Sequence, residues 1–427
     1  HLEFIEDQID AYWTVIDEYG PVVRLWIGPF DMFLIAEPDL IEEILVDKPR
    51  TFHKDVVSKE LDILLGRGLL ITDGDLWRQQ RKLVAPPLQR RQIAHYAYVM
   101  VAQTERMIEQ WEDGQTVRFD RQATELTLRI VVQTLFDLEM EGEIEEIAEA
   151  VDDTMEFIDQ LRHSAWRFVP DPIPTPKERQ FEEAKAHLDE IIYELIERRR
   201  RRDEPGDDLL YRLLQATDEA GHQMSDEQLR DEVITLFLAG HETTAMALTY
   251  AWYLVARHPR VEERLQAEID DVVGDDRPGV EHARELPYTE AVFKESMRLF
   301  PPAWAVGRQP VEDVEIGDYT IPEGAQVIIP QCIVHRDERW FDDPDAFRPE
   351  RWLGDLEDEL SRFGYFPFGG GPRICVGNHF AEMEGILAIA TIAKHCTFDH
   401  VASDEMATYT SITQRPEEAV ELQVRFR

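Results

Sequence analysis

The feature that most constrains how this chain can fold is a segment that starts at Ser225 and contains no proline before Pro259. Ser225 followed by Gln228 has the spacing of a capping box, which marks the start of a helix. About 30 residues with a rise of 1.5 Å each form a helix roughly 45 Å long. The sequence therefore predicts one long helix that passes through the molecule and around which other elements pack.

Helical periodicity dominates the rest of the chain, and strands are expected only near the start and in the last third. The segments 22–27 and 32–36 read as a hairpin around the turn at 28–31, and Pro38 suits the first turn of a helix. The proline-broken segment from Val169 to Pro176 is expected to be a loop that could act as a lid. Further short strands are expected at Val314–Ile316, Tyr319–Ile321, Ala325–Ile329, Thr408–Ile412 and Val420–Val424.

The charge balance excludes several classes of partner. Asp plus Glu number 87 against 45 for Lys plus Arg, which gives a net charge of -42 and disfavours nucleic acid or an anionic membrane as a partner. The cations are 8 Lys and 37 Arg, and this composition resembles proteins of salt-accumulating microbes. About 1 M salt shortens the screening length to roughly 3 Å, which relieves self-repulsion. A high-salt cytosol is expected, with simple acidic solubility as the alternative.

No apolar run approaches the roughly 20 residues that a transmembrane helix needs, so no transmembrane segment is expected. The first residue is His1 and not Met, which leaves open whether N-terminal residues or a leader are missing. Cys332, Cys375 and Cys396 are an odd number of cysteines without a CxxC pair. Neither a disulfide framework nor a structural zinc site is indicated, and a reducing compartment is expected.

The strongest local signal is the run FGGGPRICVG at residues 368–377, which places Cys375 just before a helical segment that starts near Asn378. Glycines let the backbone approach a flat ligand, and amides that point at such a cysteine would lower its pKa and favour the thiolate, a soft ligand for iron. Cys332 in an expected strand and Cys396 in an expected helix are interpreted as small core residues. A phosphate-binding loop is the alternative, although GK[ST] and GxGxxG spacings are absent.

Five positions of this run, Phe368, Gly371, Arg373, Cys375 and Gly377, match the haem-binding signature of the cytochrome P-450 family, and the chain resembles that family. The resemblance implies heme b (iron protoporphyrin IX) as cofactor, with Cys375 as the iron ligand and Phe368, Arg373 and Gly377 at the cofactor. It implies a mainly α fold with a small β region, a triangular helical prism with a long central helix and small β-sheets. A single domain would span 1–427, β-rich at about 20–36, 305–330 and 405–427 and α-rich at about 75–300 and 378–397.

The family also has a Glu-x-x-Arg helix, which Glu295 and Arg298 match. The same spacing recurs elsewhere, for example at Glu197 and Arg200, because such pairs are common on helix surfaces. Only the pair at 295 is followed by a proline break and then by FRPERW at 347–352, the next landmark of the family. The resemblance implies a buried structural triad formed by Glu295, Arg298 and Arg351.

The run AGHETT at residues 239–244 lies on the predicted long helix and resembles the family's oxygen-activation segment, where an acid and an alcohol meet at a helix distortion. Oxygen activation consumes protons, so Thr243 is expected to orient them and Glu242 to relay them. Gly240 weakens the helix by about 1 kcal/mol relative to alanine and would let the backbone open toward the haem. The alternatives are ordinary back-bonding by the threonine hydroxyls and His241 as an iron ligand.

The two haem propionates need cationic partners. Trp77 and Arg81 match the family's Trp-x-x-x-Arg pattern and lie one helical turn apart. The resemblance implies that Arg308, His335 and Arg373 occupy positions that also contact propionates. Trp77 could at the same time be a core residue, because its ring can pack while its N–H donates.

A group of cations without acidic residues lies between Leu76 and Thr104. The resemblance implies that electrons arrive from a separate protein, and an acidic ferredoxin or flavodoxin would be attracted to such a patch. The alternative is that these cations serve only propionates and local acids. The five cations are Arg78, Arg81, Lys82, Arg90 and Arg91.

The activity implied by the resemblance is that of a haem-thiolate monooxygenase. It would activate O2 with electrons from NAD(P)H through a separate redox partner and hydroxylate or epoxidise a hydrophobic substrate such as a fatty acid or an isoprenoid. A peroxide-driven peroxygenase and a non-catalytic haem sensor are the alternatives, although a sensor would have little use for Glu242 and Thr243. Substrate contacts are expected from Val56–Ile71, Met155–Pro176, Phe237–Thr244, Pro302–Val306 and the tip near Ser411.

Overall fold

The computed structural model describes residues 8–27, 30–55, 61–136, 154, 157, 176–202, 206, 208–217, 221, 223–401 and 406–427. The predicted lid at 169–175, and the predicted substrate-contact residues at 56–60 and most of 155–175, lie outside this range.

The helices are α2 (Gln8–Tyr19), α3 (Pro38–Glu42), α5 (Asp62–Leu65), α6 (Gly74–Val84), α7 (Arg90–Ile108), α8 (Phe119–Phe136), α10 (Pro176–Arg201), α11 (Leu209–Gln215), α12 (Asp226–Arg257), α13 (Pro259–Val272), α14 (Val280–Ala283), α15 (Pro287–Leu299), α16 (Gln331–Val334), α17 (Leu356–Glu359) and α18 (Asn378–His395).

Within the described residues, the strands are short and form four small sheets. They are β1 (Val22–Ile27), β2 (Phe30–Ile35), β3 (Phe52–His53), β4 (Thr116–Arg118), β5 (Val306–Pro310), β6 (Val314–Ile316), β7 (Tyr319–Ile321), β8 (Gln326–Ile329), β9 (Cys396–His400), β10 (Thr408–Thr410), β11 (Gln414–Pro416) and β12 (Glu421–Phe426). Short helices of other types are the π-helix η1 (Glu43–Asp47) and the 3-10 helices η2 (Pro86–Leu88), η4 (Pro349–Leu353) and η5 (Gly371–Arg373).

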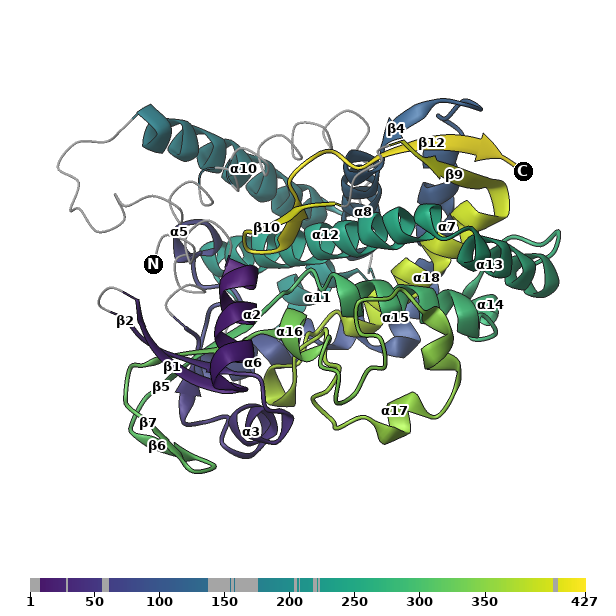
Figure 1. Ribbon diagram of the computed structural model, residues 1–427. Coiled ribbons are helices and arrows are strands. Elements are labelled where there is room, and N and C mark those ends of the chain that lie inside the picture. The colour runs from purple at the N-terminus through teal and green to yellow at the C-terminus, as the bar shows by residue number, and fades with distance from the viewer. Residues whose placement is uncertain are drawn as a thin grey trace.

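The long helix α12 crosses the middle of the molecule, as the sequence predicts (Figure 1). Its first turn is capped by Ser225, whose Oγ accepts a hydrogen bond from the Gln228 amide at 3.2 Å. It ends at Arg257, and Pro259 then opens α13, because proline has no N–H to continue a helix. From Leu229 to Val255 the helix is buried on all sides except at a few central positions. Such a helix is the axis of the core.

The remaining helices pack around this axis. Helix α8 packs along α12, and α18 packs against both α7 and α12. One continuous hydrophobic core joins these helices to the C-terminal sheet, in which β12 pairs antiparallel with both β4 and β9. Figure 1 shows this sheet at one end of the molecule, beside the C-terminus.

The largest sheet lies at the opposite end in Figure 1 and has the strand order β1-β2-β8-β5-β3. The predicted hairpin forms as β1 and β2, with Val22 opposite Ile35, and β2 runs parallel to β8. This sheet has its own hydrophobic cluster, which includes Phe363 and Phe366 just before the glycine loop. The loop therefore starts from a well-packed support.

Three expectations about secondary structure are wrong. Strand β4 (Thr116–Arg118) lies among the helices that follow the first sheet strands, where no strand was expected, because β12 recruits it as an edge partner. Cys332 lies in the short helix α16 and not in a strand, and Cys396 opens β9 and is not helical. Both cysteines are buried core residues, as expected, with 3% and 0% exposure.

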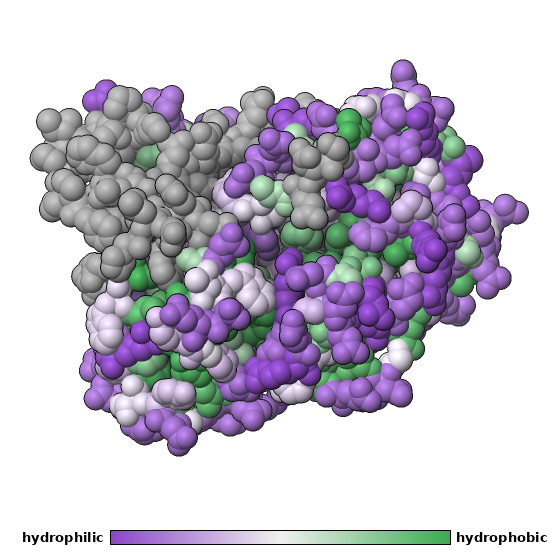
Figure 2. All heavy atoms as spheres, viewed as in Figure 1, coloured by the Kyte–Doolittle hydropathy of each residue, from purple (hydrophilic) through white to green (hydrophobic). Residues whose placement is uncertain are grey.

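The outer face shown in Figure 2 is mostly hydrophilic, with smaller hydrophobic areas. This agrees with the large excess of charged side chains in the sequence. Among the described helices, none combines the length and the hydropathy that a bilayer-crossing segment requires.

Candidate active site

The glycine loop brings Cys375 to the start of α18. Gly371 has φ +66, and a Cβ there would lie 1.9 Å from the Leu45 carbonyl oxygen, so only glycine fits. The Cys375 amide donates to the Phe368 carbonyl at 2.9 Å, which folds the loop back on itself. Gly377 is the N-cap of α18. The loop is thus held tightly and presents Cys375 in a fixed place.

The Cys375 side chain is accessible to solvent although protein surrounds it on most sides. This enclosure raises the pKa of the thiol, whereas the Gly377 amide and the charge of Arg81 act to lower it. The expectation of a lowered pKa is therefore wrong for the protein without a bound metal, because enclosure outweighs the amide. A metal cation that binds the sulfur displaces the proton and reverses this balance.

The centre of α12 is the second accessible place. Between Leu229 and Val255, only Ala239, Gly240 and Thr243 are not buried. These residues coincide with the segment that the sequence marks for oxygen activation. At these three positions the helix can therefore be contacted by a ligand.

The local geometry of this segment corrects one expectation. Helix α12 continues without a break through Gly240, and a Cβ there would lie 3.1 Å from Val131 of α8. Gly240 therefore allows α8 to pack closely rather than opening the backbone. Thr243 Oγ1 donates to the Ala239 carbonyl at 2.7 Å, so the back-bonding alternative holds for this hydroxyl, whose oxygen can still accept.

His241 and Glu242 leave α12 in other directions. His241 is 2% exposed and its Nδ1 lies 2.7 Å from the Phe237 carbonyl, which gives it a core position. Glu242 is 6% exposed, and its Oε1 accepts hydrogen bonds from Thr413 Oγ1 at 2.6 Å and from Arg415 Nη2 at 2.6 Å. The predicted relay acid is thus bound to the C-terminal hairpin β10–β11.

Arg373 stands in the glycine loop and reaches α6. Its Nη1 donates to the Thr72 carbonyl at 3.0 Å, and its Nη2 forms an ion pair with Asp73. Its guanidinium lies over the Trp77 ring, 4.5 Å from the centroid, while the ring also packs against the main core. Trp77 is therefore both a core residue and a platform for Arg373.

Arg81, one turn after Trp77, is half-buried. Burial lowers the pKa of Arg81, and the charge of Cys375 opposes this shift, which places the two side chains near each other. A cation close to Cys375 would favour the thiolate form. The structure therefore brings Arg81 within electrostatic range of the predicted iron ligand.

Lys54, Arg308 and Arg373 form a cation cluster that the sequence did not reveal in full. Burial lowers the pKa of Arg308 to about 10, and the charge of Arg373 contributes. Lys54 is still partly accessible, yet its protein surroundings lower its pKa to about 7, with contributions from both arginines. Asp55 and Asp73 offset only part of this repulsion. Three cations that repel one another form a site that an anionic group would stabilise.

His335 belongs to a different group of residues. It is fully buried, and its Nε2 accepts a hydrogen bond from the Phe366 amide at 2.9 Å. Burial lowers the pKa of His335 to about 3, so the ring is neutral at pH 7 and offers no charge to a propionate. His335 instead supports the segment that leads into the glycine loop.

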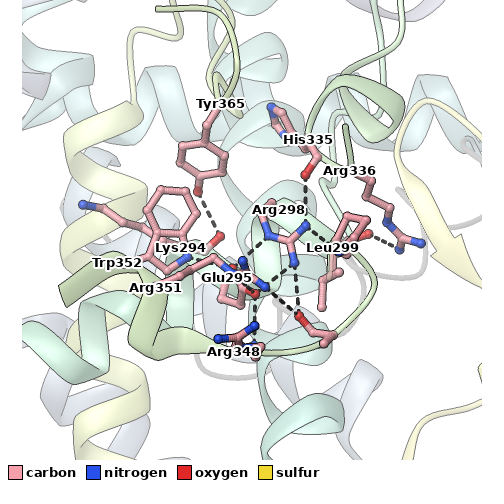
Figure 3. Close-up of polar contacts among 12 residues, drawn as sticks. Lys294, Glu295, Arg298, Leu299, His335, Arg336, Arg348, Arg351, Trp352 and Tyr365 are labelled. Carbon is pink, nitrogen blue, oxygen red and sulfur yellow. Dashed lines mark hydrogen bonds and ion pairs between the residues drawn. The ribbon is translucent and has the colours of Figure 1, made fainter. Parts of the chain in front are cut away.

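The predicted triad is present and fully buried at its centre (Figure 3). Glu295 accepts from Arg298 Nε and Nη2, each at 2.9 Å, and from Arg351 Nε at 2.9 Å. Trp352 Nε1 donates to the same carboxylate at 2.7 Å. Arg298 also donates to the His335 carbonyl at 3.0 Å, which ties the triad to the support of the loop. Every charge of this network has a partner, which is the condition for burying it.

Comparison with known proteins decides the family. The model of the family described as cytochrome P-450 matches residues 2–422. The chain belongs to the cytochrome P-450 family. It is a cytochrome P-450 monooxygenase, and the family implies a haem-thiolate cofactor.

Relatives and solved structures agree with this assignment. The chain is 36% identical to a cyclooctatin synthase of Streptomyces melanosporofaciens over 88% of this chain and 82% of that protein. It is 32% identical to a pentalenene oxygenase of Streptomyces avermitilis over 89% of this chain and 85% of that protein. The crystal structure of the cytochrome P450DA heme domain matches with a TM-score of 0.91 and 26% identity, covering 100% of this chain and 95% of that one.

The residues of this structure fit the implied cofactor. An accessible thiol on a rigid loop suits an iron ligand, and three crowded cations suit two carboxylates. Lys54, Thr413 and Arg415 are the residues that sequence reasoning missed. Lys54 had a weak signal, as a lysine in a chain that has few, whereas Thr413 and Arg415 meet Glu242 only through tertiary packing.

Proposed function

We propose that Cys375 binds the iron of heme b and that Arg81, Arg373, Arg308 and Lys54 hold its propionates. The single observation that carries this proposal is the accessible Cys375 thiol on a loop whose Arg373 belongs to the cation cluster. Phe368 and Gly377 complete the contacts of the loop. When bound, a haem-thiolate iron supplies the activation of O2 for oxygen insertion into a C–H or C=C bond.

The protein's own groups handle protons and exclude water. Thr243 lies at the accessible centre of α12 and its hydroxyl, fixed by the Ala239 carbonyl, orients a proton donor. Glu242 is the neighbouring acid and exchanges protons with solvent near the C-terminal hairpin. The buried surroundings of α12 keep bulk water from other directions.

The substrate that suits this site is hydrophobic, such as a fatty acid or an isoprenoid. Among the relatives, a pentalenene oxygenase and a cyclooctat-9-en-7-ol 5-monooxygenase carry substrate names that describe an alkene and an alkenol. Trp304, which is 7% exposed and donates to the Ser411 carbonyl at 3.1 Å, joins two of the segments expected to line the substrate space.

The electron donor proposed for this chain is a separate acidic protein of the ferredoxin or flavodoxin type, which passes on electrons from NAD(P)H. Arg78, Lys82, Arg90 and Arg91 are exposed, whereas Arg81 is half-buried toward Cys375. Ile374, next to Cys375, is 37% exposed. Exposed basic side chains and an exposed apolar residue suit an acidic partner with an apolar centre. High salt would weaken the attraction.

A turnover assay tests the proposed function. The purified protein is screened with lipophilic compounds for a shift of the Soret band, and those that shift it are incubated with ferredoxin, ferredoxin reductase and NADPH under O2. The expected result is a product that has gained one oxygen atom from 18O2. Turnover with hydrogen peroxide alone at an equal rate would favour a peroxygenase. Spectral shifts without any product in either assay would favour a haem sensor.

A further inference from the structure

The carboxylate of Glu242 is held by a clamp from the C-terminal hairpin. Its Oε1 accepts from Thr413 Oγ1 at 2.6 Å, from Arg415 Nε at 2.9 Å and from Arg415 Nη2 at 2.6 Å. The Glu242 and Arg415 side chains are 8% and 23% exposed, so solvent screens this ion pair little. Charge-assisted bonds of this kind are the strong ones in proteins.

All three bonds end on the same oxygen. A guanidinium that met the carboxylate in the common fork geometry would occupy both oxygens. Here Nε and Nη2 converge on Oε1, and Oε2 takes no part in the clamp. The clamp therefore fixes the direction in which Oε2 points and leaves this oxygen for proton exchange.

The hairpin that supplies the clamp is fixed by other bonds. Tyr250 Oη donates to the Gln414 carbonyl at 2.8 Å, and the Gln414 amide donates to the Pro302 carbonyl at 2.9 Å. Trp304 Nε1 donates to the Ser411 carbonyl at 3.1 Å. These bonds end on the backbone of the hairpin, so its position does not depend on the Arg415 side chain. Removing that side chain changes the surroundings of Glu242 and leaves the hairpin in place.

We propose that Arg415, assisted by Thr413, is the positioning residue for Glu242 in proton delivery. This inference rests on the proposed role of Glu242 in the monooxygenase reaction. Arg415 holds the carboxylate at one oxygen and leaves the other to exchange protons that reach the site at Thr243. Without the clamp, the acid rotates away, and electrons that should enter product are lost to peroxide.

The experiment measures coupling, the share of NADPH electrons recovered in hydroxylated product, in the haem-loaded enzyme. Arg415→Gln is expected to reduce coupling and kcat by about tenfold, the size of a lost hydrogen bond to a charged group, with KM unchanged. Arg415→Lys keeps one charged donor and is expected to recover part of the coupling. Arg425→Gln is the control, because Arg425 pairs with Asp399 at 2.9 Å on the exposed surface of the same C-terminal segment.

A double-mutant comparison separates positioning from structure. In a Glu242→Gln background, Arg415→Gln is expected to cause no further loss, because both changes remove the same function. Infrared spectra of the resting enzyme give a second readout, in which the carboxylate band assigned by Glu242→Gln shifts in Arg415→Gln and stays in Arg425→Gln. Thr413→Val provides a milder break of the clamp should Arg415→Gln fail to fold.

The outcomes distinguish the inference from the proposed function. Loss of coupling in Glu242→Gln together with normal coupling in Arg415→Gln overturns the positioning role alone. Losses that add fully in the double mutant show that Arg415 acts independently of Glu242 and overturn it as well. Normal coupling in Glu242→Gln itself refutes the relay role of Glu242, and the inference fails with it.

Discussion

The guanidinium of Arg373 lies 4.5 Å from the centroid of the Trp77 ring, so the glycine loop and helix α6 meet through a cation stacked on an indole. This contact holds Arg373 in the cation cluster, and Arg373 Nη1 also donates to the Thr72 carbonyl. The stacking and the ion pair with Asp73 together fix the arginine beside α6, where its remaining N–H groups can meet an anion. Haem retention should therefore depend on this arginine.

Arg373→Gln is expected to release haem about tenfold faster than the unchanged protein, because a charged partner of a propionate is lost. The measurement is the rate of haem transfer to an excess of apomyoglobin. Arg362→Gln is the matched control, since Arg362 is 61% exposed and pairs with Glu42 at the surface. Equal release rates in both variants would contradict the propionate assignment.

Lys54 gives the haem site a pH dependence with a definite sign. Burial lowers the pKa of Lys54 to about 7 before haem binds, and the protonated form attracts a propionate. Haem affinity in the wild type should exceed that of Lys54→Met at pH 6, and this advantage should fade as pH rises above 7, where the free lysine is neutral. Titration of the haem-free wild type and of Lys54→Met with hemin at pH 6 and 9 measures this difference in affinity. An advantage that is the same at both pH values would exclude Lys54 from the site.

The triad should dominate stability near the cofactor. Glu295→Gln leaves Arg298 and Arg351 without their carboxylate in a buried place and should cost about 3–5 kcal/mol in the free energy of unfolding. Urea denaturation measures this cost. Glu197→Gln breaks an exposed pair with the same spacing and should cost less than about 1 kcal/mol. Should Glu295→Gln fail to fold, Trp352→Phe, which removes one 2.7 Å bond, replaces it. Similar costs for the buried and exposed pairs would contradict this account.

The hydroxyl of Thr243 is the second proton-handling group. Thr243→Ala removes it at the accessible centre of α12, while the backbone of the helix is unaffected, so folding and haem content should be normal. NADPH consumption should continue with several-fold more hydrogen peroxide and less product. Thr244→Ala is the neighbouring control, because Thr244 is buried and donates to the Gly240 carbonyl at 3.3 Å. Equal coupling in both variants would leave Thr243 with back-bonding alone.

The basic patch predicts how electron transfer depends on salt. Exchanging Arg90 and Arg91 for glutamate should slow reduction by an acidic ferredoxin at low ionic strength, and the difference from wild type should shrink at high salt. Stopped-flow reduction at several salt concentrations measures this. Rates that do not change in the double variant at low salt would place the docking surface elsewhere.

Local patterns explain why much of the fold could be predicted. The cap at Ser225 and the absence of proline specify α12, and the alternation around residues 22–35 specifies the first hairpin. The triad was predictable only through the family resemblance, in which a segment like FRPERW follows the Glu-x-x-Arg helix. Cys332 and Cys396 were assigned to the wrong elements because short apolar runs do not distinguish helix from strand.

The parts of the site that escaped prediction depend on long-range packing. Glu242 meets Arg415 across 173 positions of sequence, and Arg373 meets Asp73 across 300. No pattern within a short stretch of sequence predicts such contacts.

The bond between the Cys375 sulfur and a haem iron is tested most directly by the absorption spectrum of the reduced protein under carbon monoxide. We predict the strongly red-shifted Soret band that thiolate ligation produces, and its loss in Cys375→Ala while Cys332→Ala keeps it. A spectrum without this band in the unchanged protein, or a band that persists in Cys375→Ala, would contradict the account.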